Sequence, residues 1–248
     1  MSTYNNEVAD NVFRLGNEYF NFYLIRDGRE FTLIDAGFPG FLGQVESLVR
    51  KLGGSLGDIR AILITHAHLD HVGFASTLKK TTGCPIYAHS LDDKRLRCGG
   101  AQIPPWGLLL NAWRPHPIKM LATAVLNNVF FGPSIREYIP FKQDGETLDV
   151  PGKSQVIFTP GHTFGSVSFW LPDRKVLFAG DALVTINMLT GKKGKPQITP
   201  RLTEDDRQQV LQSLNKYKDL GDLTLLTGHG DPWTGDIACT IETLQTDI

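Results

Sequence analysis

Four side chains of the kinds that bind metal ions fall within six consecutive positions, and this stretch constrains the fold more than any other part of the chain. It follows directly on the apolar run Ala61-Ile62-Leu63-Ile64 and reads Thr65-His66-Ala67-His68-Leu69-Asp70-His71. Alternate side chains of an extended segment share one face, so a strand carried past its end would direct His66, His68 and Asp70 to one side. His71 breaks the alternation, which predicts a turn after Asp70 and a helix that begins near Val72.

Imidazole nitrogens suit zinc, and a carboxylate broadens the choice to iron or manganese. A single tetrahedral site made of all four side chains is one interpretation. Adjacent residues on a stiff backbone rarely all reach one ion, however, so we expect the four to be divided between two ions. Two ions need further ligands from elsewhere in the chain.

Three downstream segments offer such ligands in a similar setting. Each places a polar residue beside glycine after a short apolar run, and glycine lets the backbone turn tightly at the end of a strand. A lone histidine in such a place is usually a surface or core residue, but five of the seven histidines share the setting, which favours metal binding. The three candidates are His162 in Pro160-Gly161-His162-Thr163, Asp181 after Gly180, and His229 between Gly228 and Gly230.

Together, the motif H-x-H-x-D-H and the three downstream segments resemble the metallo-β-lactamase superfamily, and most of all its glyoxalase II and lactonase branches. The similarity runs from about Val12 to the last turn and includes Leu33-Ile34-Asp35-Ala36-Gly37 and Leu177-Phe178-Ala179-Gly180-Asp181. It implies an α+β fold, a four-layer αββα sandwich with the metals at the seam between two sheets. We expect residues 1–248 to form a single domain of this type, because 41% hydrophobic residues over this length suffice for one large core.

The resemblance also implies how the ligands are shared. Asp35 is expected to accept backbone hydrogen bonds in the turn Asp35-Ala36-Gly37 rather than to bind metal. His89, which has no glycine or second ligand beside it, is expected to lie away from the metals. His66, His68 and His162 would hold one ion, Asp70, His71 and His229 would hold the other, and Asp181 would bridge the two.

The chemistry expected of such a centre is hydrolysis. A hydroxide shared by two cations about 3.5 to 4 Å apart is available near neutral pH, because metal binding lowers the pKa of water to roughly 7. It would attack an ester, thioester or lactone carbonyl of a small molecule, and Asp70 would relay a proton as well as bind metal. We expect two divalent metal ions, zinc before iron or manganese, and no serine or cysteine nucleophile.

Neighbouring branches of the superfamily leave other functions open. Persulfide dioxygenases resemble the same pattern with one iron, which His66, His162 and Asp181 would hold. Glyoxalase II proper has a helical C-terminal extension that helps to bind glutathione, whereas only 19 residues follow His229 here (248 minus 229). True β-lactamases generally lack an aspartate at the bridging position, so Asp181 argues against antibiotic hydrolysis. A metal-stabilised binding protein without turnover would leave the full ligand set unexplained.

Charge and composition exclude several partners. The net charge is −1 and the pI about 6.6, so no global field would attract nucleic acid or an anionic membrane. The first residues lack the basic and then apolar pattern of a secretory signal, and no apolar run approaches the length of a membrane span. We therefore expect a cytoplasmic protein with free thiols at its three cysteines.

The segment from about residue 98 to 140 differs most from the family that the chain resembles. His68 and His162 lie 94 positions apart (162 minus 68), which is more than is typical of the resembling enzymes. The additional residues are mostly apolar and aromatic, with proline and glycine among them. They predict a helical insertion. It is interpreted either as a lid that shapes an apolar substrate pocket, with Trp106 and Trp113 as its test positions, or as a satellite core or homodimer contact.

The remaining pattern predicts strands and helices in both halves of the chain. Strands are expected over residues 12–15, 20–25 and 30–34, with a hairpin turn at Asp27-Gly28. A helix from Phe41 is expected to end at Gly53-Gly54, and others cover residues 72–80 and 236–248. In the second half a helix is expected to open at Thr203-Glu204-Asp205-Asp206 with a capping-box-like spacing. The basic loop Met188–Lys195 is interpreted as solvated or as a contact for a substrate carboxylate.

Overall fold

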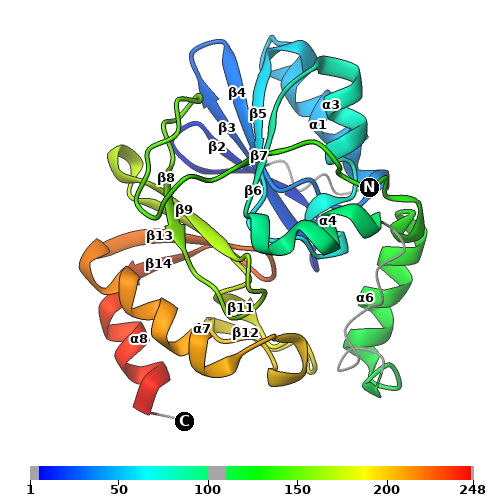
Figure 1. The fold of residues 1–248 in the computed structure, drawn as a ribbon. Coiled ribbons are helices and arrows are strands. Elements are labelled where there is room, and N and C mark those ends of the chain that lie inside the picture. Colours follow the sequence, from blue (N-terminus) through cyan, green and yellow to red (C-terminus); the bar gives the residue numbers. More distant parts are fainter. Residues whose placement is uncertain (1–5, 100–109, 247–248) are drawn as a thin grey trace.

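Two β-sheets packed face to face form the centre of the computed structural model, which describes residues 6–99 and 110–246 (Figure 1). The first sheet has seven strands in the order β1 to β7, antiparallel from β1 to β4 and parallel from β4 to β7. The predicted hairpin turn at Asp27-Gly28 joins β3 to β4. The strands are β1 (Asn6–Ala9), β2 (Val12–Gly16), β3 (Asn21–Asp27), β4 (Glu30–Ile34), β5 (Ile59–Leu63), β6 (Ile86–Ala88) and β7 (Ile139–Pro140).

The second sheet is built from the second half of the chain. It has five strands in the order β14-β13-β10-β9-β8, and only β10 and β13 run parallel to each other. A separate hairpin of β11 (Val184–Ile186) and β12 (Lys193–Gln197) carries the basic loop. The strands of the large sheet are β8 (Gln155–Phe158), β9 (Val167–Leu171), β10 (Val176–Gly180), β13 (Asp222–Thr227) and β14 (Trp233–Asp236).

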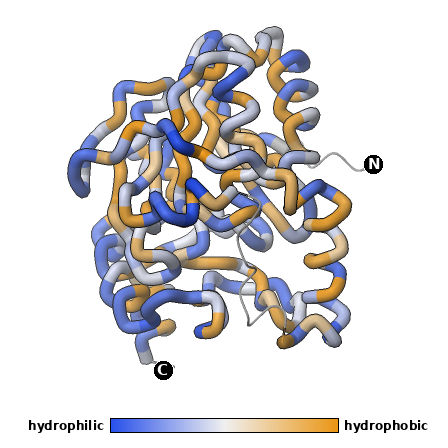
Figure 2. The backbone as a smooth tube through the Cα atoms, turned by 45° about the vertical axis from the view of Figure 1, so that its right-hand side comes forward, coloured by the Kyte–Doolittle hydropathy of each residue, from blue (hydrophilic) through white to orange (hydrophobic). Residues whose placement is uncertain are grey.

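Alternating side chains along the strands create three hydrophobic cores. In β3, Phe22 packs on the outer face of the first sheet, whereas Tyr23 packs in the space between the two sheets. In β10, Phe178 points into that same space and Leu177 points to the outer face of the second sheet. This period of two buries both faces of each sheet. Figure 2 shows hydrophobic and hydrophilic stretches interspersed along the chain.

Helices cover the two outer faces, so the layers run α, β, β, α. On the first sheet, α1 (Leu42–Lys51) buries Val45 and Leu48, and α3 (Ala75–Thr82) buries Leu78. The second sheet is covered by α7 (Arg207–Leu214), the 3-10 helix η8 (Asn215–Leu220) and α8 (Ile237–Thr246). The predicted four-layer αββα sandwich is confirmed. Within residues 6–99 and 110–246, no helix has the length and apolar character needed to cross a membrane.

Two helices begin at other residues than predicted. The helix expected from Val72 is divided into α2 (Leu69–Val72) and α3, and the Gly73 between them lies so close to the Gly37 carbonyl that a Cβ would meet its oxygen at 2.4 Å. The helix expected to open at Thr203 begins at Arg207 instead. Asp206 is its N-cap residue and accepts a hydrogen bond from the backbone N–H of Gln209, because a carboxylate stabilises a helix N-terminus well.

The segment predicted as a helical insertion contributes α6 (Pro115–Leu126) and the 3-10 helix η5 (Val129–Phe131), and α4 (Asp93–Cys98) precedes it. Figure 1 shows α6 along one side of the molecule. Trp106 lies outside the described residues. Trp113 is 76% exposed, with the guanidinium of Arg114 5.0 Å from its ring centroid, and it does not line the pocket described below. The homodimer contact and the cytoplasmic location stay predictions.

Candidate metal centre

The seven predicted ligands come together where strands of both sheets end. The parallel neighbours β10 and β13 end at the same edge of the second sheet, and Gly180 pairs with Thr227 there. The strand β5 of the first sheet also ends at this seam. His66 and His68 follow β5, Asp70 and His71 lie in α2, His162 lies between β8 and β9, Asp181 follows β10, and His229 follows β13.

Three histidine rings converge in the first cluster. Nδ1 of His68 lies 3.1 Å from Nε2 of His66 and 3.0 Å from Nε2 of His162. The nitrogens of a tetrahedral zinc site lie about 3.3 Å apart, given Zn–N distances of about 2.0 to 2.1 Å. The spacing of the three rings therefore matches that of nitrogen ligands around one ion.

The second cluster joins a carboxylate to two more histidines. Oδ2 of Asp70 lies 3.3 Å from Nε2 of His229 and 3.6 Å from Nε2 of His71. Both rings are buried, and the side chain of Asp70 is 18% exposed. Such a mixed nitrogen and oxygen set suits zinc, iron or manganese.

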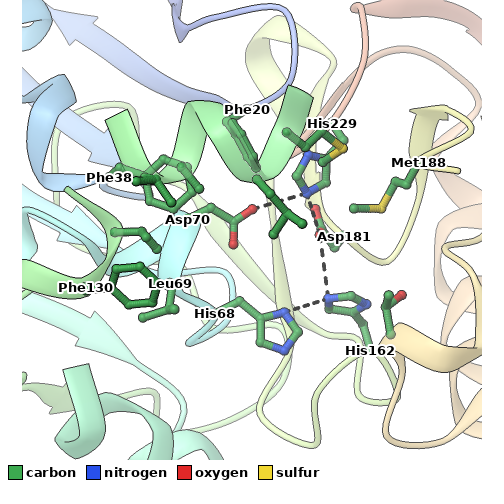
Figure 3. Close-up of a pocket in the computed structure, with 16 residues that line it drawn as sticks. Phe20, Phe38, His68, Leu69, Asp70, Phe130, His162, Asp181, Met188 and His229 are labelled. Carbon is green, nitrogen blue, oxygen red and sulfur yellow. Dashed lines mark hydrogen bonds and ion pairs between the residues drawn. The ribbon is translucent and has the colours of Figure 1, made fainter. Parts of the chain in front are cut away.

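Asp181 lies between the two clusters. Its Oδ2 is 3.1 Å from Nε2 of His229 and 3.6 Å from Nε2 of His162. Its Oδ1 is 3.7 Å from Nε2 of His71. The carboxylate thus faces ligands of both clusters, as the resemblance implies for a bridging residue (Figure 3).

Two buried atoms show that these residues fit a cation. Nε2 of His71 and Oδ1 of Asp181 have no hydrogen-bond partner within the described part of the chain. The other ring nitrogen of His71 already lies 2.7 Å from Oδ2 of Asp35. A buried polar atom without a partner costs about 1–3 kcal/mol, and a divalent cation between the two atoms would satisfy both.

A comparison with known protein families identifies the family of the chain. The model of the metallo-beta-lactamase superfamily matches residues 16–229. The chain belongs to this superfamily. The resemblance read from the sequence motifs is therefore confirmed.

Two curated members of the superfamily illustrate the range of relatives. The chain is 29% identical over 239 residues to the probable metallo-hydrolase YflN of Bacillus subtilis strain 168, covering 92% of this chain and 87% of the relative. It is 28% identical over 211 residues to the hydroxyacylglutathione hydrolase GloC of Haemophilus influenzae, covering 82% of each chain.

Solved structures show the same fold. The metallo-beta-lactamase family protein TTHA1429 from Thermus thermophilus superposes with a TM-score of 0.69 at 25% identity, covering 97% of this chain and 80% of that chain. TTHA1623, solved in a di-iron-bound form, superposes with a TM-score of 0.60 at 27% identity, covering 89% and 92%.

Asp35 holds the ring of His71 through Nδ1, the ring nitrogen that does not face the metal centre. Its carboxylate accepts hydrogen bonds from the backbone N–H and the hydroxyl of Thr65, both at 2.8 Å, besides its contact with His71. The sequence interpretation placed the accepted backbone bond in Asp35's own turn, which is wrong, because the donor lies at the end of β5. Asp35 itself has a left-handed backbone with φ of 61°, a strain of about 1–3 kcal/mol for a residue other than glycine.

Two further histidines are held by groups outside the clusters. Nδ1 of His229 lies 2.6 Å from the backbone oxygen of Tyr19. Nδ1 of His162 lies 3.2 Å from the hydroxyl of Thr199, which in turn donates to Glu204 at 2.8 Å. Each contact leaves Nε2 to face the centre, because the hydrogen bond at one ring nitrogen decides which nitrogen is free to bind metal.

Asp92 is a supporting residue that the sequence reasoning missed. It is 2% exposed and accepts hydrogen bonds from the backbone N–H of Ala67 at 2.8 Å, the Thr163 hydroxyl at 2.8 Å and the backbone N–H of Gly165 at 3.3 Å. It therefore ties the segment of the first two histidines to the segment of His162. Its only sequence signal is its place shortly after β6, a strand end without glycine beside it.

Burial by itself lowers the pKa of each histidine in the centre. Where carboxylates lie close to a histidine, they act against burial and raise its pKa. For His162, burial and the ring of His68 lower the pKa to about 3. For His71, the carboxylates of Asp35 and Asp70 outweigh burial and raise the pKa to about 9. At Asp70 burial raises the pKa, but the charges of His71 and His229 and the hydrogen bond to His229 together outweigh burial and lower the pKa to about 2. Without metal, the first cluster presents neutral nitrogens, whereas the second holds a proton that a metal ion would displace.

Other candidate residues lie apart from the clusters. His89 accepts a hydrogen bond at Nδ1 from the backbone N–H of Leu91 and belongs to none of the candidate metal groups of the described residues. His116 lies in the first turn of α6, where its ring packs on that of Tyr19 with the two centroids 5.3 Å apart. In the basic loop, Lys193 forms an ion pair with Asp231 and lines a different cavity, beside α8.

Proposed function

We propose that the protein is a hydrolase that uses two divalent metal ions, zinc before iron or manganese, on an ester, thioester or lactone bond of a small molecule. The observation that carries the proposal is the position of Asp181, whose Oδ2 lies 3.6 Å from Nε2 of His162 in the first cluster and 3.1 Å from Nε2 of His229 in the second, while its Oδ1 has no hydrogen-bond partner among the described residues. A single ion would use the ligands of only one of the two clusters. The relatives include a probable metallo-hydrolase and a hydroxyacylglutathione hydrolase by name.

The candidate ligands would bind the two ions as the sequence motifs imply. When bound, the two ions would polarise a carbonyl oxygen and lower the pKa of a water towards neutrality. His66, His68 and His162 would hold one ion, Asp70, His71 and His229 would hold the other, and Asp181 would contact both.

The protein's own groups would then orient the ligands and move the proton. Asp35 holds the ring of His71 through Nδ1, and the backbone of Tyr19 holds that of His229. Asp70 lines the cavity and is the most exposed carboxylate of the centre, at 18% against 3% for Asp181. It is therefore the group of the centre best placed to take a proton from water and pass it to the leaving group.

Replacing Asp181 with alanine tests the proposal. The variant should lose one or both metals, and kcat/KM should fall on the order of a thousandfold, because Lewis-acid stabilisation is worth several kcal/mol. Metal content by plasma emission spectrometry and hydrolysis of a neutral thioester in a pH-stat are the two measurements. The matched control is Asp173→Ala, in the exposed turn after β9. Wild-type activity in Asp181→Ala would contradict the proposal of a two-metal hydrolase.

A second function has one observation in its favour. His66 and His162 lie 4.0 Å and 3.6 Å from Oδ2 of Asp181 through their Nε2 atoms. Two histidines and one carboxylate are the ligand set of mononuclear iron oxygenases, so a persulfide dioxygenase is the alternative. One iron per chain with oxygen uptake on a persulfide would establish it, whereas two zincs with acid release would establish the hydrolase.

A further inference from the structure

The cavity above the metal centre is lined by two kinds of residue. Its volume is about 110 Å³. Five of the candidate ligands form one side, and with the exception of Thr203 every other lining residue of the described chain is apolar (Figure 3). The apolar residues are Phe20, Phe38, Leu69, Met120, Leu121, Ala124, Val125, Val129, Phe130 and Met188.

Resting on the proposed hydrolase function, we propose that the substrate carries a compact, uncharged apolar acyl group, which binds between α6 and the Phe20 and Phe38 side while its carbonyl faces the metal ligands. The nearest polar atoms available to that group are those of the ligands themselves and Thr203. Recognition of the acyl group is thus hydrophobic, and each methylene that enters the cavity should raise kcat/KM about fourfold, the factor equivalent to about 0.8 kcal/mol.

The absence of lysine and arginine from the described lining argues for an uncharged acyl group. Among the described residues, no lysine or arginine lines this cavity. Lys192, Lys193 and Lys195 line the separate cavity beside α8. A substrate carboxylate would therefore be buried without a cationic partner, which is unfavourable. This distinguishes the pocket from one built for a charged carrier such as glutathione.

The volume sets the size of the acyl group. An apolar protein cavity of about 150 Å³ holds one benzene molecule, and the cavity here is somewhat smaller, about 110 Å³. An acyl chain of about six carbons, or a phenyl group, would fill it. Val125 and Phe130 line the cavity and are 56% and 58% exposed, so the remainder of a longer chain would extend into solvent on that side. The gain in kcat/KM should therefore level off beyond hexanoyl.

Two alanines of α6 provide a matched pair of variants. Ala124 lines the cavity, whereas Ala122 is exposed and does not line it. Two positions correspond to about 200° around a helix, which places the two side chains on opposite faces. Ala124→Trp should fill the cavity, and Ala122→Trp should add the same bulk on the outer face.

The experiment is an acyl series of neutral thioesters from acetyl to octanoyl, measured with zinc-loaded protein. In wild type and Ala122→Trp, kcat/KM should rise about fourfold per methylene up to hexanoyl and then level off. In Ala124→Trp the series should be flat, because the added ring occupies the space that the longer acyl groups would fill. A flat series in wild type, or a preference for a glutathione thioester over a neutral thioester of the same acyl group, would overturn the proposal.

A binding measurement separates failure of the pocket from failure of the hydrolase. Hexanamide and acetamide serve as neutral probes, with saturation-transfer NMR on metal-free protein. Hexanamide binding that is lost in Ala124→Trp supports the pocket even if no turnover is found, whereas turnover without hexanamide binding overturns the pocket and keeps the hydrolase. If circular dichroism shows Ala124→Trp to be unfolded, Leu121→Ala replaces it. That variant enlarges the cavity and should move the plateau to longer acyl chains, and an unmoved plateau counts against the pocket.

Discussion

The ligand side and the α6 side of the cavity are built in contrasting ways. On the ligand side, His162, Asp181 and His229 are almost fully buried, and hydrogen bonds from several segments hold the surrounding groups. On the α6 side the lining is apolar, and Val125 and Phe130 are more than half exposed. No side-chain hydrogen bond fixes these apolar residues, since they have no polar side-chain atoms.

The contrast indicates how each side should respond to mutation. Buried polar groups act as a unit, because removal of one leaves others without a partner. Exposed apolar groups act almost independently, because each contributes in proportion to the area that it buries. The ligand side should therefore give large, coupled effects, and the α6 side should give small, graded ones.

Among the residues that support the ligands, the largest effect is expected at Asp35. Asp35→Asn keeps the left-handed backbone, which asparagine tolerates, but removes the charge behind His71. Metal affinity should fall about 10- to 100-fold, the usual effect of losing an outer partner of a ligand. Isothermal calorimetry with zinc measures it, with Asp173→Asn as the control.

The pH dependence of that affinity distinguishes positioning from general damage. In wild type, affinity should rise with pH as the ligands His71 and His229 lose their protons, because against the effect of burial the neighbouring carboxylates raise the pKa of His71 to about 9 and raise that of His229 as well. Asp35 raises the pKa of His71, so in Asp35→Asn the part of the rise that belongs to His71 should move to lower pH. An unchanged profile with weaker binding would mean that Asp35 supports only the fold.

A smaller and more local effect is expected at Asp92. Asp92→Asn removes the charge that joins the segment of Ala67 to that of Thr163 and Gly165. Zinc affinity should fall about tenfold at one site, the one assigned to His66, His68 and His162, with the other unchanged. A two-site zinc titration resolves the pair. Equal weakening of both sites, or the same loss in the neighbouring Asp93→Asn, would contradict a local role.

The smallest effect is expected on the outer face of α6. Leu126 is 81% exposed, so Leu126→Ser should change the free energy of unfolding by less than about 0.5 kcal/mol. Met120, on the same helix, is 2% exposed, and Met120→Ala should cost about 2–5 kcal/mol. Urea unfolding measures both. A loss above about 1 kcal/mol in Leu126→Ser that depends on protein concentration would show that this face is buried in the predicted homodimer.

Much of the centre could be predicted from the sequence because most of the ligands follow shortly after the end of a strand. His162, Asp181 and His229 all stand beside glycine after an apolar run, a local pattern that needs no knowledge of the fold. The β-rich runs likewise predicted the strands β2, β3 and β4 of the first sheet. What the pattern could not supply was which strand ends meet, and that pairing came from the family resemblance.

The supporting groups could not be predicted in this way. Asp92 and Thr199 reach the centre only through tertiary packing, and the oxygen that holds His229 is a backbone atom of Tyr19, which leaves no mark on the side-chain pattern. The division of one expected helix at Gly73 depends on its contact with Gly37, a residue far away in the sequence. Similarly, hydrophobicity predicted a helix at α6 but not which of its alanines faces the cavity.

Anomalous X-ray scattering at the zinc edge, from crystals grown with zinc, tests the two-ion centre most directly. The account predicts two peaks, one among His66, His68 and His162 and one among Asp70, His71 and His229, with Asp181 in contact with both. A single peak held by His66, His162 and Asp181, or no peak at this seam, would contradict it.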